Sequence, residues 1–201
     1  RRSQRDLEAN PLTRLPGNVS IIKELQNRLD SKKLFAVGYL DLDKFKSYND
    51  KYGFAHGDEI IQETARIMIR SIKALGNADD FIGHIGGDDF VFICTPNCID
   101  AICEKIIKDF EKVAPAFYNE EDRSNGYIMG VDRKGNVARF PLVSVSIGVV
   151  SNEVRKFNHM AEINEVGAEL KEHAKRLEHS NYVKDKRADK SIKEGEANEK
   201  I

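Results

Sequence analysis

A short apolar run, residues 34–40, ends directly in two acidic residues, Asp41 and Asp43. A continuous apolar segment of this length is typical of a strand that is buried on both faces of a sheet. Carboxylates at the end of such a strand are costly to bury unless a cation or a hydrogen bond accompanies them. The run therefore predicts a central strand whose carboxyl end carries a polar site.

A second acidic pair lies in a glycine-rich turn. Two apolar runs, residues 81–85 and 90–93, flank the sequence Gly86-Gly87-Asp88-Asp89. Glycine permits the positive φ angles of a tight turn, so this segment predicts a β-hairpin. In a compact sheet the hairpin turn and the end of the central strand can lie side by side. Their carboxylates would then repel one another unless a cation lay between them. Oxygen ligands of this kind suit Mg²⁺, whose coordination shell substrate phosphates can complete. The alternative is that both pairs are solvated turn residues.

The remaining segments combine helical and strand-like patterns. Apolar residues recur at helical spacing, and Gly53 is expected to stop the helix that precedes it. Asp58 is expected at the N-terminus of the next helix, where its side chain would serve as a cap. A second hairpin is predicted over residues 126–141, with no role beyond extending the sheet. Strands and helices alternate irregularly, which predicts an α+β fold with helices covering a sheet. The predicted helices cover residues 19–29, 44–52, 58–72, 99–110 and 160–177.

Composition excludes several classes of function. The 201 residues include 40% hydrophobic and 32% charged residues, as expected of one globular domain. The net charge of −1 offers no basic field for a nucleic-acid partner. No apolar run approaches the roughly 18 residues that cross a bilayer, so we expect no membrane contact and a cytoplasmic location. An odd set of cysteines without a tight pair, Cys94, Cys98 and Cys103, predicts reduced thiols rather than a disulfide or a zinc site.

The two ends of the chain differ in pattern from its centre. Residues 1–9 are polar, and we interpret them as the end of a linker helix from an upstream domain. Residues 10–183 are interpreted as one domain. Residues 184–201 are rich in charge and poor in apolar residues, so a frayed or disordered tail is expected there.

A series of sequence motifs occupies residues 10–18, 41–46, 49–50, 57–59, 86–90 and 143–148. In their order and spacing these motifs resemble those of GGDEF domains. The resemblance implies a fold like that of nucleotidyl cyclases and polymerase palms, with a central, mostly antiparallel sheet flanked by helices. It also implies a diguanylate cyclase, in which a homodimer condenses two GTP to cyclic di-GMP and pyrophosphate. An upstream sensory or receiver domain would control it.

The same resemblance assigns the acidic residues to metal binding. Asp41 and Asp88 would be Mg²⁺ ligands, with the Leu42 carbonyl as a third. Asp88 and Asp89 would form the catalytic pair, with Asp89 a second metal ligand or the group that helps activate the attacking hydroxyl. Two Mg²⁺ per site are implied, and Mn²⁺ could replace them.

Nucleotide binding is assigned in the same way. Asn49 and Asp58 would hydrogen-bond the guanine edge, and the main-chain N–H groups of Lys44, Phe45 and Lys46 would hold the phosphates. Lys175 would reach the β- and γ-phosphates. A carboxylate can accept from both N1–H and N2–H of guanine, while adenine offers no such pair. We therefore expect a preference for GTP over ATP, which a buried Asp58 would enforce by about 1–3 kcal/mol.

The chain departs from the family pattern at positions that matter for activity. Asp89 stands where Glu is usual, so its carboxylate falls about 1 Å short, and misplacement on that scale can cost roughly 100-fold in rate. Phe54 replaces a common His, while His84 and His179 stand where Arg is common. The Arg of the family's product-inhibition site is replaced by Asn77, so no strong product inhibition is expected there.

Three functions therefore remain open from the sequence. The first is an active diguanylate cyclase, and the second is a GTP-binding regulatory module without chemistry. The third, a purely structural dimerisation domain, has no need of the metal- and nucleotide-binding residues that this chain retains. As a plain alternative, His84 is a strand residue with ordinary packing.

Overall fold

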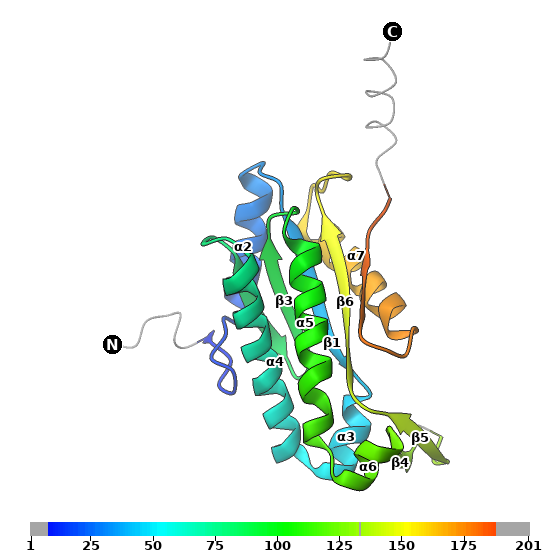
Figure 1. Ribbon diagram of the computed structural model, residues 1–201. Coiled ribbons are helices and arrows are strands. Elements are labelled where there is room, and N and C mark those ends of the chain that lie inside the picture. Colours follow the sequence, from blue (N-terminus) through cyan, green and yellow to red (C-terminus); the bar gives the residue numbers. More distant parts are fainter. Residues whose placement is uncertain (1–7, 133, 188–201) are drawn as a thin grey trace.

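The computed structural model describes residues 8–132 and 134–187, and Figure 1 shows their arrangement. Five strands form the main sheet in the order β2-β3-β1-β6-β7. Their bounds are Ala36–Asp43 for β1, Phe81–Gly86 for β2, Asp89–Cys94 for β3, Ser144–Ser151 for β6 and Asn181–Lys184 for β7. All neighbouring pairs are antiparallel except β6 and β7. The predicted α+β fold with a mostly antiparallel sheet is confirmed.

Strand β1 is the centre of this sheet, as its apolar run predicts. All eight of its residues are buried, and it pairs with β3 on one side and β6 on the other. Its side chains alternate between two cores, as the two-residue period of a strand requires. Leu40 and Leu42 face one core, whereas Val37 and Tyr39 face the other. The strand therefore fixes the position of whatever lies at its carboxyl end.

Two pairs of helices cover the two faces of the sheet (Figure 1). Helices α4 (Phe54–Leu75) and α5 (Ile99–Val113) enclose the core that includes Leu40 and Leu42. Helices α2 (Asn18–Asp30) and α7 (Met160–Lys175) enclose the other core. Helices α4, α5 and α7 present buried residues at spacings of three and four, the pattern of an amphipathic helix, and α2 buries Ile21 and Leu25, four residues apart. None of the helices in the described ranges is long and apolar enough to span a membrane.

Helix α3 (Phe45–Tyr52) is followed at once by α4, which corrects one expectation. Gly53 stops α3, as predicted, but α4 already begins at Phe54. Gly53 has φ = +88°, a conformation that glycine adopts without steric cost, and this permits a sharp turn between the two helices. Asp58 is therefore the fifth residue of α4 and does not cap it.

The second hairpin is present but does not extend the main sheet. Strands β4 (Tyr127–Val131) and β5 (Val137–Pro141) form a separate two-stranded sheet. Ile128 anchors this hairpin in the core, while Val131 and Val137 remain exposed. A short 3₁₀ turn (Ala114–Phe117) and helix α6 (Glu120–Asn125), neither of which was predicted, connect α5 to it.

The C-terminal part that the structure describes also differs from expectation. Lys184 ends strand β7 instead of beginning a tail, and the Asp185 N–H donates to the Val149 carbonyl at 2.9 Å. Residues 1–7 and 188–201 lie outside the described ranges. Most of the predicted linker helix and most of the predicted tail therefore lie outside them too. Cys94, Cys98 and Cys103 are free and buried.

Two glycines let α7 approach the sheet closely. A Cβ added to Gly148 of β6 would lie 2.6 Å from both the Gly167 carbonyl oxygen and the Lys171 backbone nitrogen of α7. A Cβ added to Gly167 would lie 2.3 Å from the ring of Tyr39 in β1. Because these neighbours include backbone atoms, the helix is positioned directly against β6.

This contact gives a test of the packing. We expect Gly148→Ala to push α7 away from the sheet and to lower the free energy of unfolding by about 1–3 kcal/mol, as overpacking does. Denaturant unfolding followed by circular dichroism measures the loss. The matched control is Gly130→Ala in β4, where the added Cβ meets only the Phe140 ring, at 3.1 Å. An equal loss in both variants would show that α7 can move away at no special cost.

Candidate functional site

The two acids at the end of β1 are buried but have different partners. Both side chains point to the α7 side, since residues two apart share a face. Asp43 accepts hydrogen bonds from Ser144 Oγ at 2.7 Å and from Ser146 Oγ at 2.8 Å and 2.9 Å. Burial raises the pKa of Asp43 and the two serine hydroxyls oppose that shift. The oxygens of Asp43 are thus occupied within the protein.

Asp41, in contrast, has one occupied oxygen and one free oxygen. Its side chain is buried, with the residue 4% exposed. Asp41 Oδ2 pairs with Lys175 Nζ at 2.9 Å and with Lys171 Nζ at 3.2 Å. Asp41 Oδ1 is buried without a hydrogen-bond partner. Burial raises the pKa of Asp41 to about 6, with Lys175 opposing the shift and the nearby Asp88 carboxylate adding to it.

The glycine-rich turn lies beside this carboxylate. Gly86 pairs with Asp89 across the hairpin, so Gly87 and Asp88 form a two-residue loop, and Gly87 has φ = +57°. Glycine adopts this left-handed backbone conformation without steric cost. The Asp89 carboxylate accepts a hydrogen bond from Lys171 Nζ. The structure therefore brings Asp41, Asp88 and Asp89 to one place, as the sequence predicted for two strand ends.

Lys171 is the residue that sequence reasoning missed. It lies one helical turn before Lys175 on α7, and residues four apart share a helix face. Its ammonium group bridges Asp41 and Asp89, with 17% of its side chain exposed. Burial alone would lower the pKa of Lys171, but the two carboxylates raise it on balance. A lysine on a charged helix resembles a solvated residue until the fold places it against buried acids.

His84 connects the turn to the N-terminal loop. Its Nε2 lies 2.9 Å from the Gly87 carbonyl oxygen, and its Nδ1 lies 2.9 Å from Thr13 Oγ1. Because a carbonyl only accepts, Nε2 carries the proton in the neutral ring and Nδ1 accepts from the Thr13 hydroxyl. The ring also stacks on Phe90, with centroids 4.2 Å apart. His84 is thus a packed strand residue, as expected, but it also braces the turn that carries Asp88.

The start of α3 lies immediately after β1. Lys44 has φ = +60° and is the N-cap of the helix, without a side-chain cap. The first N–H groups of a helix have no partner within it, so the turn from Lys44 to Lys46 can present them to an anion. The Lys46 side chain is exposed and pairs with Asp50 at 2.7 Å. The Lys46 side chain is thus engaged with Asp50, whereas the main chain at the start of α3 can still bind an anion.

The two residues expected at the guanine edge differ in burial. Asn49 Oδ1 is buried without a partner, and it packs against Gly57, where an added Cβ would lie 1.9 Å away. Asp58 is exposed on α4. Phe54, at the start of the same helix, is 78% exposed. The expected buried carboxylate is therefore not observed at Asp58, because α4 begins four residues earlier than predicted.

The other departures from the family pattern lie away from the carboxylates. His179 is exposed near the Leu177 carbonyl. In the loop that follows α4, Asp80 Oδ2 accepts from the Asn77 N–H at 2.7 Å, and its Oδ1 is buried without a partner. Arg28 of α2 donates to the Asp79 carbonyl, so an arginine reaches this loop from another helix.

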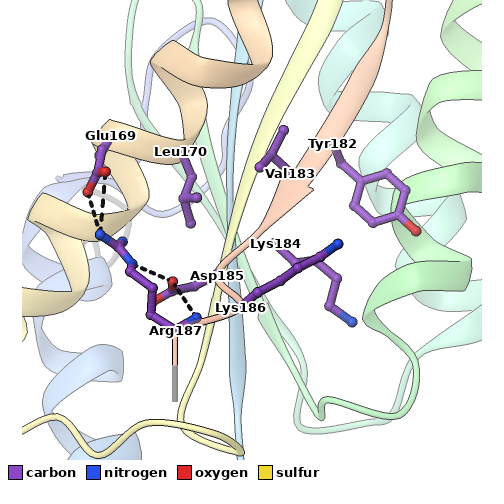
Figure 2. Close-up of a pocket in the computed structure, with 8 residues that line it drawn as sticks. All are labelled: Glu169, Leu170, Tyr182, Val183, Lys184, Asp185, Lys186 and Arg187. Carbon is purple, nitrogen blue, oxygen red and sulfur yellow. Dashed lines mark hydrogen bonds and ion pairs between the residues drawn. The ribbon is translucent and has the colours of Figure 1, made fainter. Parts of the chain in front are cut away.

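A pocket of about 770 Å³ lies elsewhere, between α7 and β7. Figure 2 shows that Arg187 pairs there with Glu169 and Asp185. None of the residues predicted to bind metal or nucleotide lines this pocket.

The donor set suits a metal that shares its shell with a ligand. Across residues 8–132 and 134–187, no three His, Cys, Asp or Glu side chains converge to hold a metal alone. Mg²⁺, however, commonly uses one or two carboxylates and completes its shell with water and substrate phosphates. The unpartnered Asp41 oxygen beside Asp88 fits such a partial ligand set.

Comparison with known proteins identifies the family. Residues 8–132 match the model described as "Diguanylate cyclase, GGDEF domain", and the chain belongs to this family. It is 35% identical over 104 residues to the bifunctional diguanylate cyclase/cyclic di-GMP phosphodiesterase MucR of Pseudomonas aeruginosa, covering 48% of this chain and 15% of that protein. It is 44% identical over 70 residues to the diguanylate cyclase DgcS of Shewanella oneidensis, covering 34% and 22%. The chain thus spans less than a quarter of either relative.

A solved structure supports the same fold over a longer stretch. The GGDEF domain of DgcB from Caulobacter crescentus, in complex with c-di-GMP, superposes with a TM-score of 0.65 at 18% identity. The match covers 91% of this chain and 98% of that domain. At this identity the likeness concerns the fold alone.

The brace around the turn gives a prediction that depends on pH. Burial lowers the pKa of His84 below its ordinary value of about 6.5. The unfolded chain therefore binds the proton more readily, and the stability that neutral His84 provides is complete above about pH 6.5 and lost as the pH falls below it. We expect His84→Gln to lower the free energy of unfolding by about 1–3 kcal/mol at pH 7.5, and by less at pH 5.

Urea unfolding of both proteins at the two pH values measures this difference. His56→Gln is the control, because His56 is exposed on α4 and its loss should change stability by less than about 0.5 kcal/mol. A His84→Gln effect that is the same at both pH values would contradict the assignment of a buried neutral ring.

Proposed function

We propose that this domain is a diguanylate cyclase that binds GTP with Mg²⁺ and condenses two GTP to cyclic di-GMP and two pyrophosphates. The observation that carries the proposal is the buried Asp41, whose unpartnered oxygen lies where the Gly87–Asp88 loop and the lysines of α7 converge. A purely structural domain gains nothing from a buried carboxylate with an unused oxygen, because such a group is costly to desolvate.

Asp41, Asp88 and the Leu42 carbonyl would hold one Mg²⁺, and Asp89 would contribute to a second. Bound Mg²⁺ neutralises phosphate charge and assists an in-line displacement at phosphorus. Mn²⁺, which takes similar oxygen ligands, should replace it. The ion pair with Asp41 holds the Lys175 ammonium group beside the proposed metal site. There it would pair with the β- and γ-phosphates once a nucleotide is bound.

The chain's own groups would orient the nucleotide. The N–H groups of Lys44, Phe45 and Lys46 at the start of α3 would hold the phosphates. Asn49 on α3 and Asp58 on α4 would hydrogen-bond the guanine edge from two adjacent helices. Because Asp58 is exposed while the Asn49 amide is half-buried, Asn49 carries more of the preference for GTP than the sequence alone suggested.

The reaction needs two such domains. In a homodimer the 3′-oxygen of each GTP would form a bond to the α-phosphorus of the other, and each α-phosphorus would release pyrophosphate. Asp89 would accept the proton of the attacking hydroxyl or help hold the metal that lowers its pKa. An upstream sensory or receiver domain would control how often the two domains meet.

A second function is favoured by one observation. The Asp89 carboxylate is shorter than the usual Glu and already pairs with Lys171. A site in this state would bind GTP without turning it over and would serve as a regulatory module for a neighbouring domain.

One experiment separates these two functions. The purified chain at high concentration is incubated with GTP and Mg²⁺, and the products are resolved by chromatography. We expect cyclic di-GMP and pyrophosphate, both lost in Asp88→Ala. GTP binding by calorimetry without any product, even when the domain is fused to a dimeric coiled coil, would establish the regulatory module instead.

A glycine on α4 offers a test of the guanine site that leaves the fold intact. We expect Gly57→Ala to displace the Asn49 amide, because the new Cβ would overlap its oxygen. The affinity for a non-hydrolysable GTP analogue should fall about tenfold or more, which is the usual effect of losing a buried polar contact. Thermal stability should change little, because alanine favours a helix by up to about 1 kcal/mol and offsets the displacement.

Calorimetry with GTP and ATP analogues measures the effect. His56→Ala, an exposed neighbour on α4, serves as the control and should keep the preference for GTP. Unchanged binding in both Gly57→Ala and Asn49→Ala would remove Asn49 from the guanine site.

A further inference from the structure

The metal-binding carboxylates of the proposed site already have a positive partner within the chain. Lys171 Nζ lies 3.2 Å from Asp41 Oδ2 and also donates to Asp89 Oδ1. Among the residues that the structure describes, Lys171 is the only lysine that pairs with both acids, since Lys175 pairs with Asp41 but not with Asp89. An ammonium group therefore occupies the space between two carboxylates that would otherwise share a cation.

The backbone fixes this lysine in place. The Lys171 backbone nitrogen lies 2.6 Å from the position of a Cβ on Gly148, so α7 meets β6 at this residue with no side chain between them. Strand β6 is the neighbour of β1, and Asp41 pairs with Ser146 across these strands. The side chain of Lys171 thus starts one strand away from Asp41 and reaches it without leaving the packed interface.

Charge at the site follows from these contacts. The ammonium groups of Lys171 and Lys175 pair with the carboxylates of Asp41 and Asp89, so they offset much of the negative charge of these two acids. Carboxylates that already have ammonium partners attract a divalent cation less strongly. At the free Asp41 Oδ1 the cation would be repelled by the nearby Lys171, and at Asp89 Oδ1 it would have to displace Lys171. A nucleotide changes this balance, because its phosphates supply negative charge and an alternative partner for the displaced ammonium.

We propose that Lys171 is an internal counter-cation that competes with divalent metal for Asp41 and Asp89, so that the site takes up metal only together with a nucleoside triphosphate. This inference rests on the proposed function, in which these carboxylates hold Mg²⁺. Lys171 acts here as a positioning residue, because its ammonium group determines whether the carboxylates of Asp41 and Asp89 are available to a metal ion. It also offsets part of the charge of Asp41 and Asp89 while no nucleotide is bound.

Binding of Mn²⁺ alone tests the proposal without any catalytic readout. The whole chain is titrated with Mn²⁺ at pH 7.5, and free Mn²⁺ is followed by electron paramagnetic resonance. We expect Lys171→Met to bind Mn²⁺ on the order of tenfold more tightly than the unchanged chain, the size of effect that loss of one close charge gives. Its thermal midpoint should also rise on addition of Mn²⁺, while that of the unchanged chain rises less.

Two further variants keep the result interpretable. Lys171→Gln removes the charge but keeps a polar side chain, in case Lys171→Met fails to fold. Lys105→Met removes a lysine from an ion pair with Asp109 on α5, and it should leave Mn²⁺ affinity unchanged. Equal Mn²⁺ affinity in the unchanged chain, Lys171→Met and Lys171→Gln would overturn the proposal.

A second titration separates this failure from failure of the proposed function. Mn²⁺ binding is repeated with a non-hydrolysable GTP analogue, with Asp41→Asn as the variant that lacks a ligand. Binding that is lost in Asp41→Asn but insensitive to Lys171 would keep the GTP site and reject the counter-cation. Metal and nucleotide binding that persists unchanged in Asp41→Asn would remove the proposed site itself.

Discussion

The pairing of the buried Asp41 carboxylate with the two lysines of α7 is the interaction on which the arrangement of this domain depends. Strand β1 is covered on both faces and paired along both edges, so water cannot reach the buried Asp41 carboxylate from within the sheet. Removing one partner from a buried ion pair commonly costs about 3–5 kcal/mol, because the other charge is left uncompensated. Helix α7 must therefore lie close to the sheet, and Gly148 and Gly167 permit that approach. The packing of the core and the electrostatics of the site are set by the same contact.

Two carboxylates with similar burial thus have different roles. Asp43 is saturated by the hydroxyls of Ser144 and Ser146, and it contributes to the pairing of β1 with β6. Asp41, two residues earlier, keeps an oxygen without a partner. The difference lies in the neighbouring strand, because serine side chains reach one acid and not the other. The turn with Asp88 is held from the opposite side by His84, which ties it to Thr13 in the N-terminal loop. Segments far apart in the sequence therefore meet around the Asp41 carboxylate and the neighbouring turn.

Local patterns were sufficient to predict the strand, the hairpin and the stop at Gly53, since each depends on a few consecutive residues. They were insufficient where two local signals compete. Asp58 is a good helix cap by composition, but the positive φ of Gly53 allows α4 to begin earlier, so the acid lies on an exposed helical turn. The contacts of Lys171 with Asp89 and Asp41 could not be predicted from neighbouring residues, because these partners are 82 and 130 residues away along the chain. The contact of His84 with Thr13 spans 71 residues and was missed for the same reason. The separate β4–β5 sheet likewise follows from tertiary packing of Ile128 rather than from its own strand pattern.

The short acid at position 89 and the lysine at position 171 are best considered together. A carboxylate one methylene shorter lies closer to its own strand, and here that strand end faces the ammonium group of Lys171. A longer acid at this position would still meet the same positive charge, because the backbone of α7 is fixed against Gly148. In the proposed site, the charge of Lys171 would therefore influence metal binding together with the reach of Asp89. Turnover of GTP at that site would then depend on how readily phosphate draws Lys171 away from the two carboxylates.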